Sequence, residues 1–393
     1  MLNLASVIAA CLVGSSTYIG AIPISLATAL LVLTVLDRRC FVVEWNIYYS
    51  ITSLLFVIGF MVTAFSLIFD SSVQDESGVV LMALRKACIE FYCAFVVFFY
   101  LNGKTYGYIV KVLLLSFFVN STIGWIQFFY FDFARVSMLF VEPSSAGYFI
   151  CCFLFLAMAE LDRTGGSVFL KWYIFLASLL VASKAQYLIY GVYFVLRRKA
   201  VLAIMVGFGG VFFASLHQYL GEISGQYKGF ILMVNALNNI DGSNIFNMYS
   251  TYSTRFVSVY IAFQEVLANP LGMAFGEFNF IFKEKFDLYV PSVNLSDEMM
   301  FILSDAGFAS PKSRLLELLL TTGWAGVLGV VFFSYRFTRD SCKSNNPLFL
   351  SFLFFLISSF LVELNNIYLY LFVFSLLISK SRERDNLVTL RNN

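Results

Sequence analysis

The chain has 393 residues, of which 60% are hydrophobic and only 13% are charged. A soluble domain built around one core does not have this composition, so the sequence predicts an all-α polytopic membrane protein. The net charge of +2 at pH 7 gives no reason to expect nucleic acid or another polyanion as a partner.

Long apolar stretches recur along the chain, and each is a candidate membrane-spanning helix. A helix needs roughly 20 apolar residues to cross the hydrocarbon core, and it must pair its own backbone groups there. The sequence predicts about twelve spans, of which the first two and the eighth are short. They cover residues 2–18, 20–36, 45–69, 79–101, 107–131, 144–161, 167–183, 185–197, 200–216, 315–335, 347–362 and 366–379.

One long polar segment interrupts these stretches. From His217 to Arg314 the chain is polar, aromatic and charged, and the apolar pattern then resumes. The predicted organisation is therefore membrane helices one to nine over residues 1–216, one large loop over 217–314, helices ten to twelve over 315–380, and a tail over 381–393. A membrane protein with one such insertion is expected to do its chemistry there.

The Lys and Arg residues of the short connections predict the orientation, because cytoplasmic loops retain them. They fall on every second connection, at Arg38, Arg39, Lys104, Arg163, residues 197–199, Arg336, Arg339, Lys343, Lys380, Arg382 and Arg384. This alternation places both termini in the cytoplasm and the large loop outside. In a bacterium that side has no pool of ATP or nucleotide sugars.

Several kinds of chemistry have no signature in this sequence. The chain has a single histidine, no His-Glu-x-x-His motif, no Cys/His cluster and no Asp-x-Asp pair, so we expect neither a catalytic metal nor another cofactor. No phosphate-binding loop of the Walker type occurs, which argues against ATP hydrolysis.

Cations gather instead at the predicted outer face, where charge near a membrane often marks a site. They are Arg85, Arg135, Lys184, Arg255, Lys312 and Arg314. Several cations at one face suit a diphosphate, which arginine binds in a forked geometry. Each also has a simpler explanation: Arg85 can snorkel to the interface, where Lys86 and Glu90 can pair along the same helix, and Lys184 can anchor a helix end.

Glu142 is the candidate catalytic base. It precedes Pro143 and two serines that are typical of a helix start, but helix capping does not require a carboxylate beside a membrane. Burial can raise the pKa of such a glutamate, which then accepts a proton from a sugar hydroxyl.

Within the loop, residues 254–269 predict a helix at or in the membrane interface, ended by Pro270. One stripe of this helix carries Arg255, Ser258, Ala262 and Glu265, and apolar residues cover much of the rest. An ordinary amphipathic helix with a solvated charge is the alternative interpretation.

Four patches of the chain resemble the O-antigen polymerase (Wzy) and O-antigen ligase superfamily of bacterial surface polysaccharide assembly. They are Glu-Pro-Ser-Ser-Ala-Gly at 142–147, Leu-Leu-Val-Ala-Ser-Lys-Ala at 179–185, Thr-Arg-Phe through Pro-Leu-Gly-Met-Ala-Phe-Gly at 254–276, and Glu-Leu-Leu-Leu-Thr-Thr-Gly-Trp-Ala-Gly at 317–326. Their order and the position of the large loop carry the resemblance, which covers about residues 130–335.

The resemblance implies a GT-C-like fold in the bacterial inner membrane and metal-independent, inverting glycosyl transfer. The donor would be a glycan on undecaprenyl diphosphate held by Arg255 and the other outer cations, and the acceptor a second lipid-linked repeat unit. A chain-length regulator protein is a further candidate partner. The ligase branch carries a histidine near the position of Lys312, so the lysine here favours polymerase over ligase and leaves Glu142 as the substitute base.

Two other classes of protein remain open on the sequence alone. A lipid-linked oligosaccharide flippase or another transporter suits about twelve spans, although such proteins usually have two similar halves and the single large loop breaks that symmetry. A structural subunit of an assembly complex, without chemistry of its own, would tolerate alanine at Arg255 or Arg314.

Overall fold

The computed structural model describes residues 3–15, 22–36, 46–131, 136–140, 143–181, 250–289, 297–304, 309–341, 346–361 and 366–392. Every regular element in these ranges is an α-helix, as the composition predicts. The helices are α1 (Leu4–Val13), α2 (Ile22–Leu36), α3 (Ile47–Phe69), α4 (Ser71–Asp75), α5 (Ser77–Asn102), α6 (Tyr106–Tyr130), α7 (Pro143–Arg163), α8 (Val168–Leu179), α13 (Ser250–Ala268), α14 (Phe278–Tyr289), α15 (Asp297–Leu303), α16 (Arg314–Ser341), α17 (Asn346–Leu361) and α18 (Ile367–Asn392).

The helices lie where apolar stretches predict them. Ten of the predicted spans contain a described helix, and the other two, at 185–197 and 200–216, lie outside the described residues. By length and composition, four described helices can cross a membrane: α3, α6, residues 145–163 of α7, and α16. The chain therefore has the character of a helical membrane protein.

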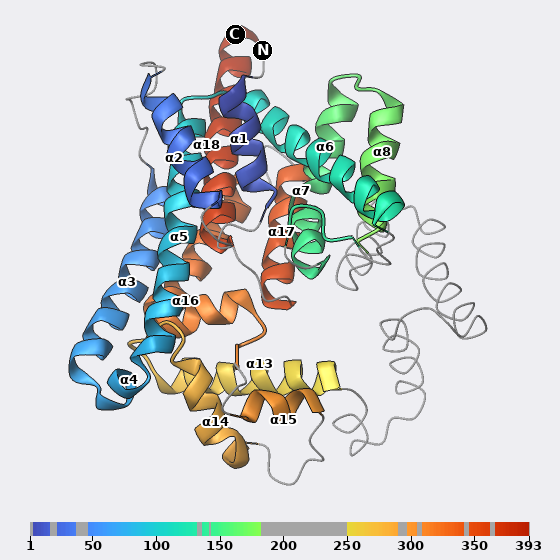
Figure 1. Ribbon diagram of the computed structural model, residues 1–393. Helices are drawn as coiled ribbons and strands as arrows, with labels where there is room; N and C mark the ends of the chain where they lie inside the picture. The colour runs from blue at the N-terminus through green and yellow to red at the C-terminus, as the bar shows by residue number, and fades with distance from the viewer. Residues whose placement is uncertain are drawn as a thin grey trace.

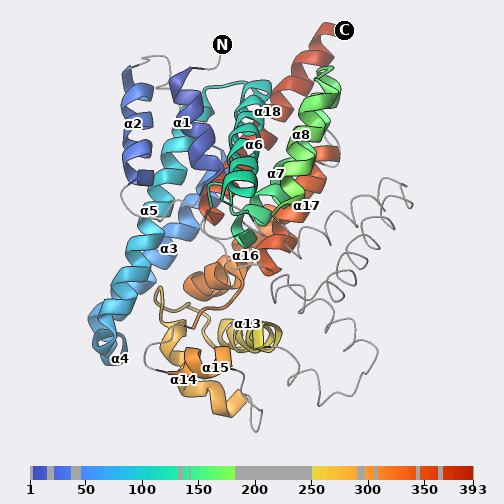
Figure 2. The ribbon, with the colours of Figure 1, turned by 45° about the vertical axis from the view of Figure 1, so that its right-hand side comes forward.

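The helices form a bundle with a second, smaller layer at one end. Most of the bundle is made of α1, α2, α5, α6, α7, α17 and α18 (Figure 1). The marked termini lie near one end of this bundle, and α13, α14 and α15 lie together beyond the opposite end. The turned view in Figure 2 shows the same separation. The described helices of the inserted segment thus lie at the end of the bundle opposite the two termini.

Helix α18 forms the centre of the bundle. Its residues 367–378 are all buried, and it packs against α3, α5, α6, α16 and α17. A helix that is apolar on every side must be surrounded by other helices, and this one is lined by aromatic rings such as Phe372 and Phe374. The apolar half of α18, residues 367–378, therefore lies in contact with five other described helices.

Helix α16 is broken at Gly323, where φ is 57° and ψ is −147°. A loop that follows α13 fits into this break: Met273 N donates to the carbonyl of Leu320 at 2.8 Å, and Trp324 N donates to the carbonyl of Pro270 at 3.0 Å. These bonds pair backbone groups that the break removes from the helical pattern. The α16 break and the loop therefore stabilise each other.

Replacing Gly323 by alanine is expected to destabilise the protein by at least about 2 kcal/mol, because only glycine adopts this backbone conformation without strain. A β-carbon there would also lie 2.4 Å from the carbonyl oxygen of Pro270. The free energy of unfolding in detergent measures the effect. Gly107→Ala is the matched control, since a β-carbon at Gly107 meets no atom within 4 Å; equal effects of the two substitutions would contradict the prediction.

The smaller layer has its own apolar core. Phe278, Phe282 and Phe286 recur every fourth residue along α14 and are buried together with residues of α13 such as Val257 and Ile261. This spacing places the three rings on one face of α14. The layer is thus held by side-chain packing as well as by the loop at Gly323.

The polar stripe predicted for α13 faces inward, which differs from the solvated face of an ordinary amphipathic helix. Ser258, Ala262 and Glu265 are all buried. Lys285 on α14 donates to both carboxylate oxygens of Glu265, at 3.0 and 2.9 Å, and Asn269 Nδ2 donates at 3.0 Å. Because these two side chains neutralise and bond the carboxylate, Glu265 can be buried in the layer.

Candidate functional site

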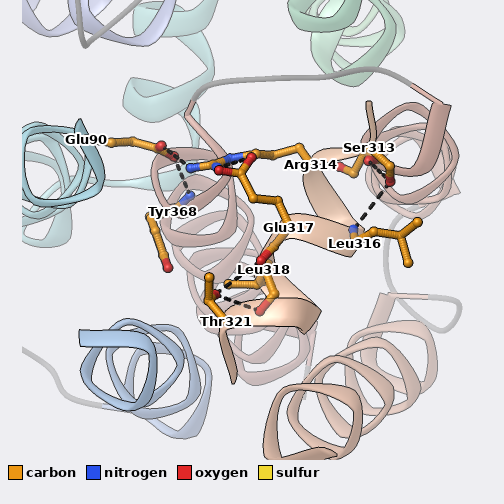
Figure 3. A network of polar contacts seen from close by, with 9 residues as sticks. Glu90, Ser313, Arg314, Leu316, Glu317, Leu318, Thr321 and Tyr368 are labelled. Carbon is orange, nitrogen blue, oxygen red and sulfur yellow. Dashed lines mark hydrogen bonds and ion pairs between the residues drawn. The ribbon is translucent and has the colours of Figure 1, made fainter. Parts of the chain in front are cut away.

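A network of buried charges joins α5, α16 and α18 (Figure 3). Arg314 lies at its centre and contacts two carboxylates: its Nη2 is 2.5 Å from Glu90 Oε2, and its Nη1 is 2.5 Å from Glu317 Oε2. The second oxygen of Glu90 accepts from the backbone N–H of Tyr368 at 3.2 Å. One ion-pair network thus connects helices that are far apart in the sequence.

The start of α16 sets the geometry of this network. Ser313 precedes the helix, and its hydroxyl accepts from Leu316 N at 3.3 Å, as a helix cap does. The same hydroxyl donates to the carbonyl of Ser359 at 3.3 Å and so links the cap to α17. Arg314 and Glu317 are three residues apart in the first turns, which places them on one face of the helix.

Glu90 also stabilises the start of α18. The first N–H groups of a helix have no partner within it, and the helix dipole favours a negative charge there. The carboxylate of Glu90 supplies that charge, because it accepts from Tyr368, the second residue of α18. This contact gives Glu90 two simultaneous partners, a helix terminus and a guanidinium.

The network is buried at Glu90 and partly exposed at Glu317. Only 1% of Glu90 is exposed, and Arg314 is buried too, whereas the side chain of Glu317 is 31% exposed. The formal charge of the three groups is −1, and Lys86 lies close enough to Glu317 to interact with it electrostatically. Glu317 is therefore a carboxylate held by a buried arginine and accessible from outside.

The network includes the start of α16, a helix that contacts both layers of the protein. The first part of α16 runs across the bundle between α5 and α13, which Figures 1 and 2 both show. Buried charges in an apolar bundle are expensive and usually mark a functional site. The Glu90–Arg314–Glu317 network is for these reasons our candidate functional site.

The predicted diphosphate-binding cations have different environments. Arg85 is exposed on α5, Lys312 is half-buried with a positive φ of 53°, and Arg314 is buried in the network. Arg255 lies on α13, but its side chain is not among those that the structure describes. The structure thus places only part of the predicted cluster. Arg314 differs most from the prediction, because it already pairs with two glutamates.

The remaining predicted residues, Arg135, Glu142 and Lys184, lie outside the described residues. The short segment between the first two is described, and side chains of α6 hold it. Gln127 Oε1 accepts from the backbone N–H of Ser137 at 3.1 Å and of Met138 at 2.8 Å. Hydrogen bonds to α6 therefore fix residues 137 and 138 of this segment.

Sequence reasoning did not identify Glu90 and Glu317 as site residues. An acid in the middle of an apolar span is a signal for Glu90, but the sequence alone suggested Lys86 as its partner, whereas the structure pairs it with Arg314. Glu317 belongs to one of the four family-like patches, yet its spacing of three from Arg314 is typical of any surface helix pair. Neither signal indicates that Glu90 and Glu317 pair with the same arginine.

A second acidic residue of the inserted segment, Glu277, serves local structure. Burial raises the pKa of its carboxyl group, which makes it a better proton acceptor than an exposed glutamate. Its Oε2 accepts from the backbone N–H of Ala274 at 2.5 Å, three residues earlier, and so closes the turn before α14. Glu317, which has no such bond to a turn, is the better candidate for contact with a substrate.

No family model matches the chain, and neither a curated protein nor a solved structure gives a match. Among the described residues, no group of three or more His, Cys, Asp or Glu side chains is arranged to hold a metal ion. The functional argument therefore depends on the geometry of the network and on the four sequence patches.

Proposed function

We propose that the chain is a bacterial polysaccharide polymerase of the O-antigen polymerase type. It would join undecaprenyl-diphosphate-linked repeat units at the outer face of the inner membrane, with about twelve spans in a GT-C-like arrangement and both termini in the cytoplasm. The observation that carries the proposal is the Glu90–Arg314–Glu317 network, in which a buried arginine holds one buried carboxylate and one that is 31% exposed. The four patches at 142–147, 179–185, 254–276 and 317–326 supply the substrate class.

The chemistry proposed for this site is a single displacement. The acceptor hydroxyl attacks the anomeric carbon of the donor sugar, the bond from that carbon to the diphosphate oxygen breaks, and the electron pair leaves with the diphosphate. Exposed Arg85 and half-buried Lys312 lie on the elements that carry the network and are suited to the leaving anion. Arg255 on α13 is a further donor-binding candidate.

The proton of the acceptor hydroxyl needs a base. Glu317 is placed for this role because Arg314 orients its carboxylate and part of it is exposed, and the same guanidinium keeps the carboxylate ionised and lowers its basicity. Glu142 remains the base predicted from the sequence, and it lies outside the described residues. The two carboxylates are alternatives that substitution separates.

Deletion of the gene in its bacterial host tests the proposal. Extracted surface glycan would be compared on a gel with and without a plasmid that supplies the wild-type chain. We expect the ladder of long polymer to collapse to core plus a single repeat unit, and to return with the plasmid. Loss of even the single repeat would favour a flippase or a ligase and contradict the polymerase.

A further inference from the structure

Helix α13 exposes an apolar stripe. Phe263 and Leu267 are exposed four residues apart on α13, and Leu271, in the turn just after the helix, is 83% exposed. The neighbouring exposed positions, Ala268 and Pro270, are apolar too. From residue 257 onward, no charged side chain of this helix is exposed.

The described part of α13 is apolar on both its inner and its outer side. Val257, Ile261 and Val266 are buried in the smaller layer, Glu265 is buried against Lys285, and Phe263 and Leu267 face outward. A helix at the surface of a soluble domain places its charges outside and its apolar residues in the core. An outward apolar face with an inward ion pair suits a helix whose outer surroundings are themselves apolar.

This stripe continues onto a membrane-spanning helix. The hydrogen bond from Trp324 N to the Pro270 carbonyl, 3.0 Å long, brings the end of α13 beside the break in α16. Beyond the break, Trp324, Leu328, Val331 and Tyr335 are exposed along one face of α16. Because α16 is apolar and long enough to cross a membrane, lipid is the natural contact of that face.

The depth of the loop after α13 agrees with contact to lipid. Phe275 N donates to Thr63 Oγ1 at 3.0 Å, and Thr63 belongs to α3, another helix that can cross a membrane. Helix α3 continues for six more residues to Phe69, about 9 Å at the rise of an α-helix. The loop therefore lies inside the end of a span, and α13 leads directly into it.

From the composition of the stripe, its continuity with α16 and the depth of the loop, we propose that the exposed face of α13 lies in the bilayer interface. The partner of this surface is lipid. Helix α13 lies across the bundle axis, as Figures 1 and 2 show, which is the orientation of a helix in the plane of the interface. The proposal does not depend on the enzymatic activity.

Photocrosslinking of the full-length chain tests this proposal. p-Benzoylphenylalanine would replace Phe263 or Leu267, and each variant would be reconstituted into vesicles of phosphatidylethanolamine and phosphatidylglycerol. Leu328 on α16 is the lipid-facing control, and Glu284 on α14, an exposed charged position, is the control for water. Mass spectrometry after irradiation identifies the adduct.

We expect phospholipid adducts at positions 263 and 267 with yields comparable to position 328 and several-fold above position 284. A crosslink between two copies of the chain at position 263 would make the face a protein interface and overturn the proposal. A lipid yield at 263 and 267 no higher than at 284 would overturn it too. Two neighbouring positions are used so that misfolding of one variant does not decide the result.

Discussion

Replacing Arg314 by methionine is expected to destabilise the protein by about 3–5 kcal/mol, because it leaves the buried carboxylate of Glu90 without its charge partner. Glu90 is 1% exposed and retains only the N–H of Tyr368 in the variant. The free energy of unfolding in detergent, from denaturant titration, measures the loss.

Lys171 provides the control for this substitution. It pairs with Asp162, whose side chain is 71% exposed, and Lys171 itself is 25% exposed. An exposed pair contributes less than about 1 kcal/mol, so Lys171→Met should change stability little. If Arg314→Met destabilises the protein no more than Lys171→Met, the buried network does not hold the three helices together.

A double variant separates the stability of the network from its function. Glu90→Gln combined with Arg314→Met removes both buried charges, and it should recover much of the stability that Arg314→Met loses. Polymer formation should not return, because Glu317 then has no guanidinium to orient it. Recovery of both properties would assign the network a structural role only.

The sequence predicts the helices of this protein well because the signal for them is local. Each span requires an uninterrupted apolar stretch, and a helix satisfies its own backbone, so no distant residue is needed to locate α3 or α6. The same reasoning fails for the break in α16. The apolar stretch continues through Gly323, and one glycine inside a helical pattern does not by itself predict a break. The loop from Pro270 to Met273 makes the break stable.

Helical periodicity also predicts which residues share a face, but not which way that face points. Ser258, Ala262 and Glu265 do lie together on α13, as their spacing requires, yet they are buried. Their burial depends on Lys285, which comes from another helix. Likewise, the pairing of Glu90 with Arg314 joins residues 224 positions apart, and no spacing rule in the sequence predicts it.

The candidate site combines two requirements that oppose each other. A buried ion pair such as Glu90–Arg314 stabilises a fold no better than well-packed apolar side chains, so stability alone does not explain why an apolar bundle contains it. The network does leave one carboxylate oriented and accessible, at Glu317. We therefore propose that the network is present because Glu317 acts on the substrate.

Replacing Glu317 by glutamine is therefore expected to lower polymer formation by about 100-fold or more, the usual contribution of a positioned acid or base. The substitution keeps the shape of the side chain and its hydrogen bonding capacity, while it removes the proton acceptor. The amount of long polymer made by the plasmid-borne variant in the deletion strain measures the effect. Accumulation of the protein in the membrane, measured in parallel, should stay close to wild type, because Arg314 keeps its bond to Glu90.

Two further variants decide what such a loss means. Glu284→Gln removes an exposed carboxylate of the inserted layer and should leave the polymer unchanged. Glu317→Asp keeps the base but shortens its reach, so its activity should lie between those of wild type and Glu317→Gln. A full ladder from Glu317→Gln would exclude this residue as the proton acceptor and return that role to Glu142, while the gene deletion would still decide whether the chain is a polymerase.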